Sequence, residues 1–200
     1  MPDLHKRDFH ADPFQQFQLW FEEAAEKGQP MPEAMGLGTV DSSGQPEVRM
    51  LLLKGMNMSS FFFYTNYESR KAQDIVNNPN ISMMFWWETV RRQVRVSGKA
   101  EKASREISEE YFRSRPRDSQ LGAWTSPQSK EIPGRTYLTK KFSEMERRFE
   151  GEDIPCPPFW GGYRVIPNRF EFWQENQHRV HDRFEYLQTD TGWRIRRLGP

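Results

Sequence analysis

The order of the predicted elements indicates an α+β fold that is mainly β, with an antiparallel barrel surrounded by helices. Strand patterns come early in the chain, helical patterns occupy the middle, and strand patterns return at the end. A regular strand–helix–strand alternation is missing, which argues against a doubly wound parallel sheet. The sequence also contains no internal repeat, so a repeat architecture is not expected.

The first half of the chain is predicted to begin with a helix and to continue mostly as strands. Asp12 can cap a helix that has Pro13 at its first position and aromatic residues at helical spacing up to Gly28. Residues 41–44 have turn chemistry and join two strands into a hairpin. Ser69 can cap a short helix that runs through Val76. The strands predicted in this half are 34–40, 47–54, 60–65, 81–87 and 93–100.

The second half is predicted to be helical first and extended afterwards. Helices are expected at 104–114, around 119–124 and at 134–150, where apolar residues fall at i, i+4, i+7 and i+11. Residues 189–192 form a turn that closes the last pair of strands. The strands predicted in this half are 163–166, 170–173, 183–188 and 193–198.

The charge balance argues against a general polyanion-binding surface. The 200 residues include 29 Lys and Arg against 28 Asp and Glu, so the net charge is +1. Nucleic acid is therefore not expected as a partner, and any basic site must be local. Apolar residues make up 36%, with 15 Phe, 7 Trp and 6 Tyr among them. Such a composition suits a chain that completes its core against a second copy of itself.

Cysteine usage and the lack of long apolar runs favour a cytoplasmic protein. Cys156 is the one cysteine in the sequence, so no intrachain disulfide can form, which fits a reducing compartment. No apolar run approaches the roughly 18 residues that a membrane span needs, so no membrane association is expected. Residues 1–11 are polar and lack the apolar centre of a signal peptide. They are expected to form a short flexible arm, followed by a single domain over 12–200.

Common motifs for nucleotide, metal and acyl chemistry are absent from the sequence. We find no G-x-G-x-x-G after a strand, no Walker A loop and no G-x-S-x-G elbow. No Cys/His spacing is typical of zinc, and no metal site is expected. Flavin chemistry is not excluded by these absences.

Two clusters have the residue types of phosphate sites. Arg70 and Lys71 fall in the first turn after Ser69, where the helix dipole disfavours cations unless an anion is bound there. The alternative is a pair of solvated surface charges. Arg115 and its neighbouring arginines follow Tyr111 and precede Ser119 at a helix end, where Arg, Ser and Tyr can hold a second phosphate. Cations are also favourable at a helix C-terminus without any ligand.

Two further clusters can orient a ligand. On an extended chain Arg179, His181 and Arg183 share one face, with Trp173 at the end of the preceding strand. In residues 49–54, an unbroken strand cannot aim both Arg49 and Lys54 at one point. Either a bulge intervenes, or the backbone makes the contacts, or the two side chains serve different parts of a large ligand.

The chain resembles the pyridoxine (pyridoxamine) 5′-phosphate oxidase family from about residue 12 to residue 200. The matching segments occur in order along the chain, which chance would hardly produce. They are 49–54 (Arg-Met-Leu-Leu-Leu-Lys), 63–66, 69–71, 92–94, 111–112, 114–120, 128–129, 159–162, 171–174, 179–183 (Arg-x-His-Asp-Arg) and 197–200. The chain departs from the family's pattern in its short N-terminus and at Glu175, Asn176 and Val180.

The resemblance implies a split β-barrel homodimer with FMN at the subunit interface. It implies oxidation of pyridoxine 5′-phosphate or pyridoxamine 5′-phosphate by O2 to pyridoxal 5′-phosphate, with H2O2 released. The implied FMN contacts are Arg49, Met50, Leu51, Leu52, Leu53, Lys54, Tyr64, Thr65, Arg70, Lys71, Gln93, Gln128, Ser129, Trp173 and Arg183. The implied substrate contacts are Lys54, Tyr111, Arg115, Ser119, Arg179, Val180 and His181, of which Arg179 and His181 are the catalytic pair.

Overall fold

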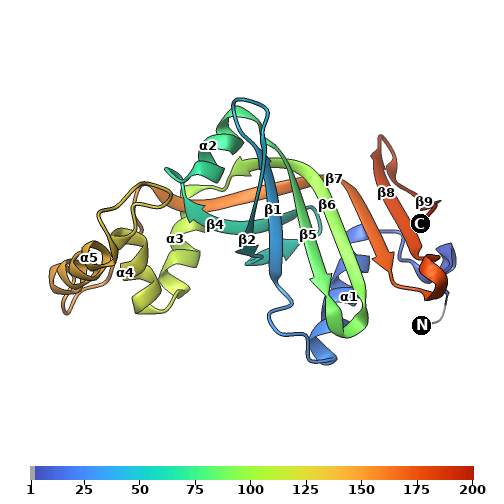
Figure 1. The fold of residues 1–200 in the computed structure, drawn as a ribbon, viewed down its shortest axis with the longest axis horizontal. Coiled ribbons are helices and arrows are strands. Elements are labelled where there is room, and N and C mark those ends of the chain that lie inside the picture. Colours follow the sequence, from blue (N-terminus) through green and yellow to red (C-terminus); the bar gives the residue numbers. More distant parts are fainter. Residues whose placement is uncertain (1–2) are drawn as a thin grey trace.

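A single antiparallel sheet of nine strands dominates the molecule (Figure 1). The structure is a computed structural model and describes residues 3–200. The main path of the sheet runs β2-β1-β5-β6-β7-β4-β3, and β8 and β9 continue from β7. The strands are β1 (Ala34–Val40), β2 (Pro46–Leu52), β3 (Gly55–Asn57), β4 (Ser60–Asn66), β5 (Asn80–Trp87), β6 (Arg92–Lys102), β7 (Trp160–Gln174), β8 (Asp182–Thr189) and β9 (Gly192–Leu198).

The helices lie around the curled sheet. Figure 1 shows α3, α4 and α5 together beyond one end of the sheet, with β8 and β9 at the other end. The helices are α1 (Pro13–Glu26), α2 (Arg70–Asn77), α3 (Arg105–Ser114), α4 (Arg117–Thr125) and α5 (Arg135–Arg148). The Asp12 side chain accepts a hydrogen bond from Phe14 N–H, which confirms the predicted N-cap of α1. Among residues 3–200, no helix is both long and apolar enough to span a bilayer.

The predicted antiparallel, mainly β architecture is confirmed, and two details of it are wrong. The three-residue strand β3 is absent from the prediction because so short a segment has no readable alternation. The strands predicted at 163–166 and 170–173 are one strand, β7, which passes through Pro167 without a break. The β6–β7 register shifts where Ser97 pairs with Arg169 and Gly98 with Pro167, so the extra, unpaired residue is Asn168 of β7 itself. A Cβ on Gly98 would lie 2.2 Å from the Ile166 carbonyl oxygen, so glycine is needed there.

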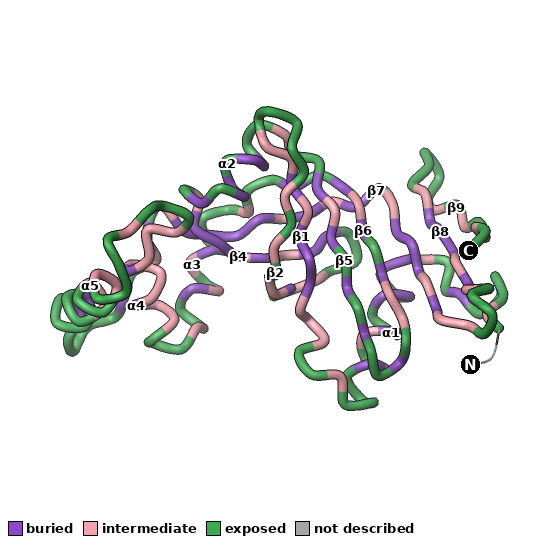
Figure 2. The backbone as a smooth tube through the Cα atoms, in the orientation of Figure 1, coloured by how far each residue is buried: buried purple, intermediate pink, exposed green. Residues whose placement is uncertain are grey.

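Two hydrophobic clusters hold the elements together, and buried residues gather along the central strands (Figure 2). In the larger cluster, Phe17 of α1 makes edge-to-face contacts with Phe61 and Phe85 at centroid distances of 5.0 and 4.9 Å. The smaller cluster lies under α3–α5 and includes Phe112 and Trp160. Aromatic burial of this kind compensates for the modest apolar content of the chain.

The N-terminal arm predicted at 1–11 contacts the last two strands. Its residues 1 and 2 lie outside the described residues. Phe9 is buried and packs on Phe184 of β8 with ring centroids 4.5 Å apart. The Tyr186 hydroxyl donates to the His10 carbonyl oxygen at 2.7 Å. Residues 4–10 are thus attached to β8, the strand that contains Arg183.

Candidate functional site

A buried lysine forms the centre of the first polar cluster. Lys71 is 8% exposed, and its Nζ lies 2.7 Å from Gln128 Oε1, 3.2 Å from Thr65 Oγ1 and 3.2 Å from Ser69 Oγ. Ser69 occupies the N-cap of α2 as predicted, but its side chain makes no capping bond. Its hydroxyl accepts from the Lys71 ammonium instead. All three oxygens around this ammonium are neutral, so the cluster holds an uncompensated positive charge.

Burial changes the proton affinity of this lysine. Desolvation, helped by the nearby Arg49 and opposed by Asp74, lowers the pKa of Lys71 from 10.5 to about 8. A bound phosphate would supply the anionic partner that the three neutral oxygens do not, and would favour the charged form. The residues present therefore fit a phosphate group.

Arg49 extends the positive cluster on the neighbouring strands. Its Nη1 donates to Thr39 Oγ1 at 2.6 Å and to the Leu37 carbonyl oxygen at 3.2 Å. Its Nη2 lies 3.6 Å from Asp74 Oδ2, which also accepts from the Thr39 hydroxyl at 2.6 Å. Asp74 and Thr39 are therefore the residues that orient Arg49. The sequence does not single them out, although Asp74 falls three positions after Lys71 on the same short helix, where a buried acid is unexpected.

Arg70 differs from its neighbour Lys71 in environment. Its side chain is 61% exposed, and its Nη2 lies 3.1 Å from Glu47 Oε1 and 3.8 Å from Asp41 Oδ2. Two carboxylates already neutralise it. The structure therefore supports the predicted anion site less well for Arg70 than for Lys71, because Arg70 is already paired with Glu47 and Asp41 at the surface.

The segment 49–54 is not one strand, so strict strand alternation does not relate the directions of Arg49 and Lys54. β2 ends at Leu52. The N–H of Leu53 then donates to the Glu33 carbonyl and that of Lys54 to the Phe62 carbonyl, at 2.9 and 2.8 Å. Met50 is 67% exposed and Leu53 is buried, while Leu51 and Leu52 are half-buried and Lys54 is exposed. The predicted residues of this segment therefore face different surroundings.

The second cluster combines stacked aromatic rings with an arginine. Tyr64 of β4 and Tyr111 of α3 stack with centroids 3.8 Å apart and an interplanar angle of 17°. The Arg115 guanidinium lies 4.6 Å from the centre of the Trp160 ring. Its Nη1 is buried and has no hydrogen-bond partner among the described residues. Burial lowers the pKa of Arg115, partly offset by Tyr111, and raises the pKa of Tyr64 to about 12. A buried guanidinium nitrogen without an acceptor is a place for an anionic oxygen.

Ser119 and Trp160 complete this neighbourhood. Ser119 lies half-buried in the first turn of α4, and its N–H donates to the Pro116 carbonyl at 2.9 Å. Trp160 carries no predicted role, although it lies in a segment that matches the family. It supports both Arg115 and Tyr64, whose ring centroid is 5.6 Å from its own. Tyr64, a predicted FMN contact, thus packs directly on Tyr111, a predicted substrate contact.

The third cluster lies across β6, β7 and β8. Gln93 pairs with Trp173, and Trp173 pairs with Arg183, in neighbouring strands of the sheet. The Trp173 and His181 rings are 4.7 Å apart between centroids. The structure therefore brings Trp173, His181 and Arg183 together, and it adds Gln93 to this group.

Arg179 does not lie in an extended row with His181 and Arg183, and that prediction is wrong. Residues Gln177–Arg179 form a 3-10 turn in which His178 and Arg179 have φ of 57° and 61°. β8 begins only at Asp182. Arg179 and Val180 are exposed on this turn. The alternation argument failed because it assumed strand geometry where the chain turns back.

The clusters lie at opposite ends of β7. Thr65 pairs with Gly161 near the start of this strand, whereas Arg183 pairs with Trp173 near its end. At about 3.3 Å per residue, this stretch of β7 is roughly 40 Å long. One copy of the chain therefore does not bring Lys71 and Gln128 together with Trp173 and Arg183. Ser129 lies on the Lys71 side, exposed and with φ of 65°.

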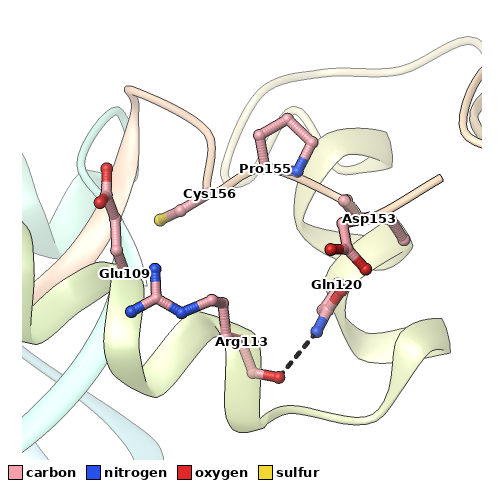
Figure 3. Close-up of a pocket in the computed structure, with 7 residues that line it drawn as sticks. Glu109, Arg113, Gln120, Asp153, Pro155 and Cys156 are labelled. Atoms are coloured by element: carbon pink, nitrogen blue, oxygen red, sulfur yellow. Dashed lines mark hydrogen bonds between the residues drawn. The ribbon is translucent and has the colours of Figure 1, made fainter.

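A separate cavity of about 400 Å³ lies between α3, the start of α4 and the loop before β7 (Figure 3). Its walls are Glu109, Arg113, Gln120, Asp153, Ile154, Pro155 and Cys156. None of these residues is a predicted site residue. The Gln120 side-chain amide donates to three backbone carbonyls, at Phe112, Arg113 and Arg115, so it braces the turn between α3 and α4.

Comparison with known proteins decides which family the chain is in. A family model described as pyridoxamine 5′-phosphate oxidase matches residues 21–149, more than half of the chain. The chain belongs to the pyridoxamine 5′-phosphate oxidase family. A second model of this oxidase family, the pyridoxine 5′-phosphate oxidase C-terminal dimerisation region, matches residues 160–200.

Curated relatives agree with this family, and solved structures share the fold of the chain. The pyridoxine/pyridoxamine 5′-phosphate oxidase of Cupriavidus taiwanensis is 49% identical over 98% of this chain and 93% of its own length. That of Rubrobacter xylanophilus is 50% identical over 94% and 87%. An FMN-binding protein from Nostoc punctiforme, related to pyridoxamine 5′-phosphate oxidase, has a TM-score of 0.75 at 16% identity and covers 92% of this chain and 97% of its own. PhzG from Burkholderia lata, bound to tetrahydrophenazine-1-carboxylic acid, has a TM-score of 0.93 at 24% identity, with 100% and 99% covered. The predicted split-barrel fold is confirmed.

Proposed function

We propose that this chain is an FMN-dependent oxidase that converts pyridoxine 5′-phosphate and pyridoxamine 5′-phosphate to pyridoxal 5′-phosphate, with O2 as the electron acceptor and H2O2 as a product. The pyridoxamine reaction also consumes water and releases ammonia. The observation that carries the proposal is the buried, unpartnered Nη1 of Arg115 beside the Tyr64–Tyr111 stack. It offers a second anion site, distinct from the one at Lys71. The names of the relatives that are 49–50% identical support the same activity. Oxygen uptake and pyridoxal phosphate formation by the purified, FMN-loaded protein test it.

The residues around Lys71 are suited to hold the phosphate of FMN. Lys71, Arg49 and the hydroxyls of Thr65 and Ser69 offer charge and hydrogen bonds within one cluster. The chemistry that FMN supplies when bound is acceptance of a hydride from C4′ of the substrate and transfer of the electrons to oxygen. The protein orients both ring systems and excludes water. Holding them at a near-attack distance accounts for much of the acceleration.

The substrate phosphate would bind Arg115, Tyr111 and Ser119 of one copy of the chain, and the substrate ring would contact Arg179 and His181 of the other copy. The arginine binds a phosphate in a two-pronged fashion, and the hydroxyls add hydrogen bonds. We assign no catalytic base. The protein is proposed to be cytoplasmic, as its single cysteine suggests.

The FMN site is proposed to be shared by two copies of the chain. The Lys71 end of one copy would meet the Trp173–Arg183 end of its partner, since the two groups are far apart within one chain. The match of residues 160–200 to a dimerisation region supports a homodimer. Exposed apolar side chains on β5 and β2 support it too, and one of them, Trp86, pairs with Gln93 of the Gln93–Trp173–Arg183 row. Val48, Met50, Met84 and Trp86 are 74%, 67%, 42% and 40% exposed, and a patch of this kind on a sheet favours a protein partner.

A heterodimer distinguishes a shared site from two separate ones. Lys71→Met and Arg183→Ala are each expected to weaken FMN binding in a homodimer. In a heterodimer of the two variants, isolated with two different tags, one shared site has both changes and the other has neither. We expect half of the sites to bind FMN with wild-type affinity, as titration would measure. If no site recovers, each FMN is bound within one chain.

Replacing Arg115 with methionine is expected to raise KM for pyridoxine phosphate about tenfold, because one charged hydrogen bond to the phosphate is lost. Nη1 of Arg115 has no hydrogen-bond partner among residues 3–200, so the free protein loses no hydrogen bond of that atom. Steady-state kinetics measure the change. Arg113→Met is the matched control, because Arg113 is an exposed arginine of the same helix end, and it should keep the wild-type KM. Equal KM values in the two variants would contradict the role of Arg115.

A further inference from the structure

The loop between β7 and β8 has an unusual backbone that needs support. It contains Arg179 and leads directly into His181. His178 and Arg179 both have left-handed φ, at 57° and 61°, a conformation that costs free energy for residues with a Cβ. Such a turn persists when neighbouring contacts hold it. The contacts that hold this turn centre on one buried carboxylate, that of Asp182.

Asp182 is 1% exposed and binds three separate parts of the chain. Its Oδ2 accepts from the Leu4 N–H at 2.9 Å and from the Asn176 side-chain amide at 2.6 Å. Its Oδ1 accepts from Arg197 Nη2. Arg197 in turn donates to the Leu4 carbonyl at 2.9 Å. The N-terminal arm and β9 thereby fix the Asp182 carboxylate, and Asn176 connects the loop to it.

Asn176 also sets the orientation of His181. The backbone N–H of Asn176 donates to His181 Nδ1 at 3.2 Å. Since Nδ1 accepts this bond, the proton of the neutral imidazole is on Nε2. The Trp173 ring, 4.7 Å away between centroids, flanks the imidazole. Nε2–H is then the hydrogen-bond donor that His181 can offer to a ligand.

We propose that Asn176 is a positioning residue for the substrate-binding loop. Its side chain fastens the loop to Asp182, and its backbone N–H holds His181 in the Nε2–H tautomer. Glu175 adds a weaker link, since its carboxylate lies 3.5 Å from Arg91 Nε and both side chains are about half exposed. The proposal rests on the proposed function of Arg179 and His181 in binding the phosphorylated pyridine.

The experiment compares three variants of the FMN-loaded protein. Asn176→Ala removes the amide, Asn176→Asp keeps its size but places a carboxylate against Asp182, and Gln177→Ala is the control. Gln177 is exposed, and no hydrogen bond of its side chain occurs within residues 3–200. Loss of the link lowers the fraction of molecules with an ordered loop, which raises the apparent KM for pyridoxine phosphate but not kcat. We expect a KM about tenfold higher for Asn176→Ala, at least as large a change for Asn176→Asp, and wild-type values for Gln177→Ala.

The second readout is the ring-nitrogen NMR spectrum of protein labelled with 15N-histidine, which does not depend on turnover. The wild type should show His181 as the Nε2–H tautomer, and both Asn176 variants should show a mixture of tautomers. A wild-type KM in both Asn176 variants, or unchanged His181 signals in them, overturns the proposal. If the wild type itself fails to oxidise pyridoxine phosphate, the proposed function is wrong, and the NMR spectra still decide whether Asn176 orients His181.

Discussion

Arg179→Ala is expected to lower turnover about a hundredfold, because a substrate ring that is displaced by about an ångström loses that much rate. FMN should remain bound at wild-type affinity, since Arg179 lies on the loop after β7 and outside the residues proposed to hold the cofactor. Stopped-flow reduction of the bound flavin by pyridoxine phosphate measures the step.

The backbone of Arg179 calls for a second variant. With φ of 61°, alanine has the same Cβ strain as the native arginine, whereas asparagine tolerates this conformation better. Arg179→Asn should therefore fold with the native loop and still lose the same turnover. Full activity in Arg179→Asn would show that the guanidinium does not orient the substrate.

Lys71→Met is expected to weaken FMN binding by about 1.5–3 kcal/mol, the value of a hydrogen bond to a charged group, or roughly 10- to 100-fold in Kd. The apoprotein should be as stable as the wild type or more stable, because the three oxygens that accept hydrogen bonds from the buried ammonium within residues 3–200 are neutral. Flavin fluorescence titration and urea unfolding measure the two effects. Arg70→Met is the matched control. Its loss of FMN affinity should be smaller, because Arg70 is 61% exposed and paired with Glu47.

The pH dependence of FMN binding gives an independent check on Lys71. Its pKa of about 8, below the ordinary 10.5, means that the free protein loses this proton as the pH rises through 8. FMN affinity should then fall, by at most about tenfold per pH unit, and Lys71→Met should lack this fall. The stability of the apoprotein changes with pH in the opposite direction to the FMN affinity. The unfolded chain binds more protons between pH 8 and 10.5, so the unfolding free energy rises across that window. A wild-type affinity that is flat above pH 8 would contradict the role of Lys71.

Local chemistry predicted much of this fold and site. The Asp12 cap, the strand alternation and the cationic clusters at Lys71 and Arg115 are properties of short segments, and the structure has them. Three features depend on long-range contacts. β7 continues through Pro167 because a bulge at Asn168 fits it against Ser97 and Gly98 of β6. Asp74 becomes an Arg49 partner only when α2 lies on the sheet.

The separation of the clusters has the same origin. Thr65 and Trp173 are each strand residues with suitable chemistry. They lie far apart because β4 pairs with the start of β7, whereas Trp173 lies near the end of β7, where β8 pairs with it. A single sequence contains no signal of this distance. The sequence also does not predict the left-handed turn at His178 and Arg179, because neither residue is glycine and the local pattern indicates an extended chain.

We propose that this chain oxidises a phosphorylated B6 compound with bound FMN. The most direct measurement mixes the FMN-loaded protein with pyridoxine 5′-phosphate without oxygen, follows the flavin absorbance, and then admits oxygen. We expect the flavin to bleach as pyridoxal 5′-phosphate forms, and then to recover its colour with release of one H2O2 per turnover. A protein that takes up FMN but keeps its colour with this substrate would contradict the claim.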